Sequence, residues 1–142
     1  MKVMLDLNVM LDVFQARHPY YHASASVISK ILNKEISGLL PSHAITTIHY
    51  ITSKYSGKQK SDETIDWMLT HFEIAAADKT SFVRARKMEI SDFEDGVVAS
   101  LAELTGCDLI VTRNISDFKK SPVKSLTPEE FLNICKTTCC WP

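Results

Sequence analysis

Several common sequence signals are missing from this chain of 142 residues. No apolar run approaches the roughly 20 residues that a membrane-spanning helix needs. The first residues lack the basic segment followed by an apolar one that marks a signal peptide. The net charge is −1, so the chain as a whole lacks the positive surface that binds nucleic acid through charge alone. We therefore expect no membrane association, and any contact with nucleic acid must be local or mediated by a metal ion.

Cysteines are few and form no recognisable pattern. There are four, of which Cys107 stands alone and Cys135, Cys139 and Cys140 crowd the C-terminus without metal-ligand spacing. Such cysteines do not make a disulfide framework, and they favour a reduced, cytoplasmic protein. The glycine-rich motifs of P-loop and dinucleotide-binding proteins are absent as well. Nucleotide-dependent enzymes are therefore excluded, and the five histidines, which lack ligand spacing, are interpreted as structural or exposed.

The chain does contain an alternation of short apolar strands and amphipathic helices. Its apolar fraction of 45% and charged fraction of 23% are those of one globular domain. The alternation predicts an α/β fold with a parallel sheet and helices on both faces. The predicted strands are Lys2–Leu5, Ile36–Leu40, Phe72–Ala76, Leu109–Val111 and Val123–Leu126, and the predicted helices are Leu7–Gln15, Tyr20–Asn33, a helix after Ser42, Asp62–His71, Lys79–Met88, an apolar helix opened by Asp95 and a helix from Pro128.

Some boundaries carry local signals. Ser42 is a plausible cap for the helix that follows it. Thr127, with Pro128 after it and Glu130 three residues on, predicts a capped helix start. The polar, basic segment Ser53–Ser61 is expected to be a connection whose lysines are solvated, with contact to RNA phosphates as the alternative. We expect the domain to span residues 1–134 and residues 135–142 to form a tail.

Carboxylates gather where the predicted strands end and where one helix begins. Asp6 follows the first strand, Asp117 follows the strand Leu109–Val111, and Asp95 opens the apolar helix. In an α/β sheet, these are the places from which side chains converge on a site. Carboxylates gathered without compensating lysine or arginine usually hold a hard metal ion, so the sequence predicts a metal site built from acids.

Four stretches carry a family resemblance. They read L-D-L-N-V-M-L-D from Leu5, D-F-E-D-G-V-V-A-S-L-A from Asp92, I-V-T-R-N-I-S-D-F from Ile110 and L-T-P-E-E-F-L from Leu126. In this order they resemble a PIN domain, and in particular the prokaryotic single-domain subgroup related to VapC-type toxins. The resemblance implies a three-layer fold around a central, mostly parallel, twisted sheet of four to five strands. It also implies a metal-dependent ribonuclease that uses Mg²⁺ or Mn²⁺.

The resemblance assigns roles to individual residues. Asp6, Asp95 and Asp117 become the catalytic, metal-binding acids, and Asp92 becomes a further candidate metal ligand. Residues implied to orient these acids or to contact a phosphate are Asn8, Thr112 and Asn114, with Glu94 and Thr47 also near the site. Carboxylate-bound divalent ions suit phosphodiester hydrolysis, because they neutralise the phosphate and activate water. The family also implies an RNA substrate, a small antitoxin that covers the site, and a homodimer.

One position departs from the family pattern, and several residues have a structural alternative. The family places a glutamate on the helix after the second strand, where this chain has Thr47, so one carboxylate is missing. Glu94 stands three residues after Ser91 and could serve only as part of a capping box. Asp12 is expected farther out than Asp6, with an indirect role at most. Arg113 is expected to be a surface or interface charge.

Two other functions remain open on the sequence. A PIN fold with weak catalysis would act as a binding module for RNA or protein, and Thr47 motivates this alternative. A phosphoryl-transfer protein would also place an aspartate after its first strand. However, dehalogenase-type proteins typically have Asp-x-Asp where this chain has Asp6 and Asn8. Receiver proteins typically have paired acids before the aspartate and a late lysine, neither of which is present.

Overall fold

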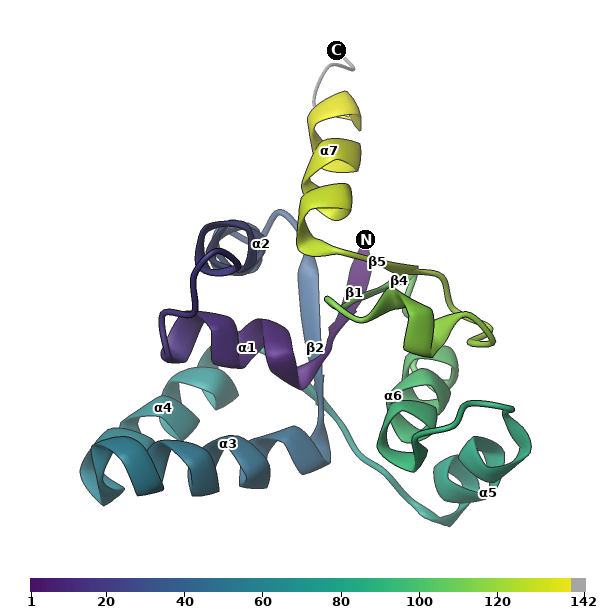
Figure 1. Ribbon diagram of the computed structural model, residues 1–142, viewed down its shortest axis with the longest axis horizontal. Coiled ribbons are helices and arrows are strands. Elements are labelled where there is room, and N and C mark those ends of the chain that lie inside the picture. The colour runs from purple at the N-terminus through teal and green to yellow at the C-terminus, as the bar shows by residue number, and fades with distance from the viewer. Residues whose placement is uncertain (139–142) are drawn as a thin grey trace.

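The computed structural model describes residues 1–138, which form a five-stranded parallel sheet between two layers of helices (Figure 1). The strands follow the order β3-β2-β1-β4-β5, and each neighbouring pair is parallel. The predicted fold class is therefore confirmed. The strands are β1 (Lys2–Leu5), β2 (Ser37–Pro41), β3 (Glu73–Ala75), β4 (Leu109–Val111) and β5 (Ser125–Leu126).

The helices divide between the two faces of the sheet. The larger core lies under α1, α2, α3, α4 and α7, and the smaller core lies under α5 and α6. No helix in the described part of the chain has the combination of length and hydropathy that crossing a membrane requires. The helices are α1 (Leu7–Phe14), α2 (Tyr21–Leu32), α3 (Ser42–Ser56), α4 (Lys58–His71), α5 (Lys79–Lys87), α6 (Phe93–Leu104), the 3₁₀ helix η1 (Ile115–Phe118) and α7 (Pro128–Thr138).

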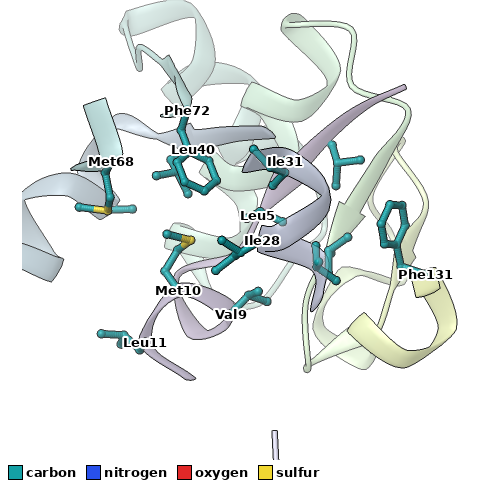
Figure 2. Packing of buried hydrophobic residues seen from close by; sticks show 14 of the residues in the cluster. Leu5, Val9, Met10, Leu11, Ile28, Ile31, Leu40, Met68, Phe72 and Phe131 are labelled. Atoms are coloured by element: carbon teal, nitrogen blue, oxygen red, sulfur yellow. The ribbon is translucent and has the colours of Figure 1, made fainter. Parts of the chain in front are cut away.

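Successive strand residues supply the two cores alternately. Val3 and Leu5 of β1 belong to the larger core, whereas Met4 between them belongs to the smaller one. Leu40 and Leu39 of β2 divide in the same way. This follows from the two-residue period of a strand, which sends neighbouring side chains to opposite faces. Figure 2 shows the larger core, in which strand residues meet side chains from α1, α2, α4 and α7. Both faces are apolar, so both must be covered by helices.

The predicted connection Ser53–Ser61 is wrong. Helix α3 continues to Ser56 and α4 already begins at Lys58, so Gly57 alone separates them. Gly57 has φ 85° and ψ 167°, a conformation that side-chain-bearing residues rarely adopt. Within α4, Lys58 pairs with Asp62 at 2.8 Å one turn further on, and α4 packs against α3. The segment is therefore the tip of a helical hairpin.

Of the two predicted helix caps, the one at Thr127 is confirmed and the one at Ser42 is wrong. The amide of Glu130 donates to Thr127 Oγ1 at 3.1 Å, and the Thr127 amide donates back to Glu130 Oε1 at 3.3 Å. This reciprocal pair is the predicted capping box. The predicted Ser42 cap is wrong, because Pro41 occupies the cap position of α3. The Ser42 hydroxyl instead accepts a hydrogen bond from the Ala77 amide at 3.2 Å, which ties the start of α3 to the chain beyond β3.

The C-terminal helix extends past the expected end of the domain. Helix α7 runs to Thr138 and projects beside α2 (Figure 1). Its Phe131 and Cys135 are buried in the larger core. The expected boundary after residue 134 therefore lies inside a packed helix. The remainder of the expected tail, residues 139–142 with Cys139 and Cys140, lies outside the described residues.

The strand order determines where side chains can converge. From β1 the chain moves through β2 to β3 on one side, and then returns to place β4 and β5 on the other side. The order reverses between β1 and β4, and ligands of such sheets bind at the carboxyl ends of the strands at this switch point. Leu5 pairs with Val111, so Asp6 and Thr112 follow the two strands at the same level. A receiver protein has the order 2-1-3-4-5, so that alternative is excluded.

Candidate active site

Asp6 lies at the floor of the switch point and is held on both of its oxygens. Its Oδ1 accepts a hydrogen bond from the Leu7 amide at 2.8 Å, which caps helix α1, and its Oδ2 accepts one from Thr112 Oγ1 at 2.8 Å. Only 7% of its surface is exposed. Burial raises the pKa of Asp6 although both hydrogen bonds lower it. A bound cation would relieve this unfavourable negative charge.

The start of helix α6 brings a second group of acids to Asp6. Asp92 is the cap residue, and its Oδ1 accepts a hydrogen bond from the Asp95 amide at 3.1 Å. The alternative in which Ser91 and Glu94 form the capping box is therefore wrong. Glu94 instead approaches His43, with Oε1 3.5 Å from Nε2. Its carboxylate therefore pairs with His43 on α3 and does not cap the helix.

Asp95 is the electrostatic centre of the acids. Its pKa is raised to about 7, first by burial and then by the negative charges of four other carboxylates. Groups with strongly perturbed pKa values in a cavity are candidates for function, because nothing in a purely structural role requires them. The four carboxylates, in decreasing order of effect, are those of Asp6, Asp92, Asp117 and Glu94.

Asp117 approaches from the segment after β4. It lies on the 3₁₀ helix η1, and its amide donates to the Asn114 carbonyl at 3.0 Å. The Asn114 amide in turn donates to Thr112 Oγ1 at 3.0 Å. The Thr112 hydroxyl therefore connects the turn that carries Asp117 to Asp6. Sequence analysis placed all three residues in the site, and the structure shows how the backbone links them.

The acids open into a cavity, which we call the acidic pocket. Its volume is about 460 Å³, and Asp92, Asp95 and Asp117 line it. Lys119 and Lys120 line the same cavity, and Lys120 Nζ lies 3.0 Å from Glu89 Oε2. The other lining residues are Glu89, Ile90, Ser91 and Ser116.

Asp12 and Arg113 form an ion pair apart from these acids. Asp12 is fully buried, accepts a hydrogen bond from Ser24 Oγ at 3.2 Å, and lies 2.8 Å from Arg113 Nε. Arg113 is not the expected surface charge, because its side chain is only 21% exposed and its guanidinium lies 4.0 Å from the Tyr20 ring centroid. This ion pair joins α1 to the segment after β4. Asn8 lies in the first turn of α1 and is partly buried.

Thr47 occupies the position where the family has a carboxylate. Its hydroxyl donates to the His43 carbonyl one turn earlier at 3.1 Å. His43 lowers the pKa of Asp6 through its positive charge, so it belongs to the electrostatics of the site. Sequence analysis missed this histidine. The available signal was its place one turn before Thr47, on the helix that follows β2 at the same edge of the sheet.

The donor set suits a hydrated divalent ion. In the described chain, no three histidine, cysteine or acidic side chains converge closely enough to form a ready-made metal site. Mg²⁺ does not require one, because it is commonly bound through one or two carboxylates together with water and substrate phosphates. The oxygens of Asp6, Asp95 and Asp117 are of the type that Mg²⁺ and Mn²⁺ prefer. The excess negative charge on Asp95 makes a cation favourable there.

Comparisons with known proteins agree with the predicted fold and with the family resemblance. Residues 2–116 match the family described as "PIN domain". The curated protein Ribonuclease VapC1 of Aquifex aeolicus is 31% identical over 135 residues, which cover 92% of each chain.

Solved structures share the fold at lower sequence identity. VapBC2 of Rickettsia felis, bound to a DNA fragment from its promoter, matches with a TM-score of 0.70 at 21% identity and covers 89% of this chain and 98% of its own. VapC20 of Mycobacterium tuberculosis, a toxin that cleaves the sarcin-ricin loop, matches with a TM-score of 0.62 at 9% identity and covers 76% of this chain and 86% of its own.

Proposed function

The chain belongs to the PIN domain family, and from this membership and the acidic pocket we propose that it is a ribonuclease that hydrolyses RNA phosphodiester bonds with Mg²⁺ or Mn²⁺. The observation that carries the metal requirement is the raised pKa of Asp95, which lies beside four other carboxylates. A site with so much uncompensated negative charge repels a phosphate unless a cation is present. The lysines at the rim alone cannot reverse that repulsion at the floor.

In this proposal, four aspartates and Thr112 each have a defined task. Asp6, Asp95 and Asp117 would hold the ion, with Asp92 as a further ligand; Asp92, Asp95 and Asp117 line the acidic pocket, and Asp6 is buried beside it. The ion would supply the positive charge that neutralises the scissile phosphate and activates a water molecule. Thr112 keeps the Asp6 carboxylate oriented through its hydrogen bond. With a pKa near 7, Asp95 can exchange a proton at neutral pH, and a cation would displace that proton.

The proposal extends to protein partners. Solved relatives with the same fold are described as VapBC proteins and as a toxin-antitoxin complex. We propose that this chain likewise pairs with a small antitoxin and forms a homodimer. Tyr50 and Tyr55 on α3 are 68% and 72% exposed, and such aromatic residues are enriched at protein interfaces. The buried cysteines Cys107 and Cys135 agree with action in the reducing cytoplasm.

A second candidate function is a binding module without efficient cleavage. The observation that favours it is Thr47, which removes one carboxylate from the family's set. A module of this kind would bind RNA or a protein through the same edge of the sheet. It would show no cleavage that depends on a metal ion.

One experiment separates the two candidates. Purified protein is incubated with end-labelled, single-stranded RNA in Mn²⁺, in Mg²⁺ or in EDTA, beside the variants Asp95→Asn and Asp66→Asn. Asp66 is an exposed acid on α4 and serves as the matched control. We expect cleavage that needs metal, is lost in Asp95→Asn and persists in Asp66→Asn. Folded wild-type protein that leaves several RNAs intact in both metals would contradict the ribonuclease and favour the binding module.

A further inference from the structure

A second cavity lies beside the acidic pocket, and we call it the aromatic pocket. Its volume is about 510 Å³, and it is formed by the start of α3, the segment after β3, α5 and the first two turns of α6. Glu94 is the single charged carboxylate on its wall among the described lining residues, and none of them is lysine or arginine. The lining residues are Ser42, His43, Thr46, Thr47, Ala77, Phe82, Phe93, Glu94 and Val97.

Two phenylalanines in this wall are stacked and remain exposed. The rings of Phe82 on α5 and Phe93 on α6 are 6.1 Å apart between centroids, with an angle of 22° between their planes. They are 44% and 45% exposed, respectively. Ala85 of α5 and Val97 of α6 belong to the smaller core, whereas these two rings do not. An exposed aromatic surface beside a cleft is a common mark of a binding site.

The two pockets share one turn of helix α6. Asp92 and Asp95 line the acidic pocket. Phe93 and Glu94, which lie between them in the sequence, line the aromatic pocket. One helical turn rises only about 5.4 Å. A ligand that fills both pockets must therefore carry a flat apolar group within a few ångströms of a group that interacts with the acids, which for an anionic group requires a bound cation.

We propose that the aromatic pocket binds a nucleobase of the RNA strand, next to the phosphate that a cation held by the acids would bind. This inference rests on the proposed ribonuclease function. A nucleotide joins a phosphate to an aromatic base at the required short separation, and bases of single-stranded RNA stack on phenylalanine rings. The hydroxyl groups of Thr46 and Thr47 and the ring of His43 supply hydrogen-bonding groups for the edge of a base.

In this arrangement, threonine in place of the family's glutamate at position 47 favours binding of the RNA strand. A glutamate at this position would add a second negative charge beside Glu94 on the wall of the pocket. Thr47 leaves Glu94 as the one carboxylate among the described lining residues, which reduces repulsion of the negatively charged strand. Its hydroxyl already donates to the His43 carbonyl, so its oxygen keeps acceptor capacity toward a ligand. The loss of one carboxylate from the acids therefore coincides with a gain for base binding.

The test compares normal and abasic RNA. After the cleavage position in an end-labelled, single-stranded RNA has been mapped, one abasic nucleotide is placed at each position around it. Cleavage is measured for the wild type, for Phe93→Leu, which keeps apolar bulk but removes the ring, and for Phe93→Tyr, which keeps the ring. Thermal unfolding shows that each variant folds. Phe93 is nearly half exposed, so a leucine is expected to be tolerated.

The expected result is a base-dependent effect. Phe93→Leu should lower kcat/KM on normal RNA by about fivefold to a hundredfold, the range for one stacked base. Phe93→Tyr should retain activity. On RNA that lacks the base at one particular position, the wild type and Phe93→Leu should cleave equally. An effect of Phe93→Leu that is the same at all abasic positions, or no effect at all, would overturn the proposal.

A second measurement separates an error in the base-binding proposal from an error in the ribonuclease proposal. If the wild type does not cleave, binding of the normal RNA and of a fully abasic RNA is compared by fluorescence anisotropy. Base-dependent binding that Phe93→Leu weakens would support the pocket while the ribonuclease proposal falls. Binding that ignores the bases, or no binding, would overturn the pocket. Unchanged RNA kinetics with weakened binding of a protein partner would assign this surface to that partner and would also overturn it.

Discussion

The hydroxyl of Thr112 donates a 2.8 Å hydrogen bond to Asp6 Oδ2, and the two residues are 106 positions apart in the sequence. The bond joins the carboxyl ends of β1 and β4, the two strands at which the order of the sheet reverses. Thr112 is fully buried and also accepts a hydrogen bond from the Asn114 amide. One side chain thus orients the first acid of the site and the turn that leads to Asp117.

Thr112→Val should impair both stability and catalysis. The valine keeps the shape but leaves the buried Asp6 oxygen without its donor, at a cost of about 1–3 kcal/mol, and removes the acceptor of the Asn114 amide. The hydrogen bond lowers the pKa of Asp6, so its loss should raise that pKa and shift the pH profile of cleavage to higher pH. Urea unfolding and a pH–rate profile measure the two effects. Thr112→Ser is the control, and an unchanged profile for Thr112→Val would contradict the role.

Asp95→Asn should abolish cleavage and stabilise the metal-free protein at alkaline pH. The folded protein holds the Asp95 proton more tightly than the unfolded chain, because the pKa is raised from 3.8 to about 7. The wild type should therefore lose stability as the pH rises through this window, and the loss should be complete above it. Urea unfolding in EDTA should show a flatter pH dependence for Asp95→Asn than for the wild type or Asp66→Asn. If the free energy of unfolding depends on pH in the same way for Asp95→Asn and the wild type, the pKa of Asp95 is not raised in the folded protein.

Divalent metal should raise Tm more at high pH than at low pH. Metal and proton compete for the same carboxylates, and binding to the folded state alone stabilises it by about 2.7 kcal/mol at a hundredfold excess over Kd. Thermal unfolding with and without Mn²⁺, above and below the Asp95 pKa of about 7, measures the difference. Asp66→Asn should behave as the wild type does. A shift in Tm that is equal at both pH values, or that survives in Asp95→Asn, would locate the ion elsewhere.

Thr47→Glu should restore the missing carboxylate. We expect the metal concentration for half-maximal cleavage to fall by about tenfold, equivalent to ~1.4 kcal/mol of binding. The added charge lies beside Glu94, so the metal-free protein should become less stable at alkaline pH. Titration of cleavage with Mn²⁺ measures the first effect. Thr47→Gln has the same size without the charge, and an equal change in both variants would rule out the electrostatic explanation.

The Asp12–Arg113 pair should behave as a buried ion pair. Arg113→Met leaves the fully buried Asp12 carboxylate without its cation, and such losses cost about 3–5 kcal/mol. The double variant Asp12→Asn with Arg113→Met removes both charges and should recover much of that loss. Urea unfolding of the two single variants and the double variant gives the coupling energy. Additive effects would show that the two charges do not stabilise each other.

The sequence specified the local elements well and their ends less well. Short continuous apolar runs place β1 and β4 correctly, and the capping box at Thr127 places the start of α7. The prediction of a connection at Ser53–Ser61 is wrong, because lysines and serines indicate a solvated segment as long as their contacts are unknown. In the structure, Ser61 is fully buried and its hydroxyl donates to the Lys58 carbonyl inside α4. Contacts between the two helices of the hairpin override the local composition.

By itself, the sequence determined the fold class, because the alternation of short apolar runs with segments of 3.6-residue apolar period is a local property of the chain. It also supplied the acids Asp6, Asp95 and Asp117 at strand and helix ends. Only the tertiary structure decided what these acids meet. The register of β1 against β4 brings Thr112 to Asp6, and the packing of α3 against α6 brings His43 to Glu94. Such contacts depend on strand order, which no local pattern of side chains encodes.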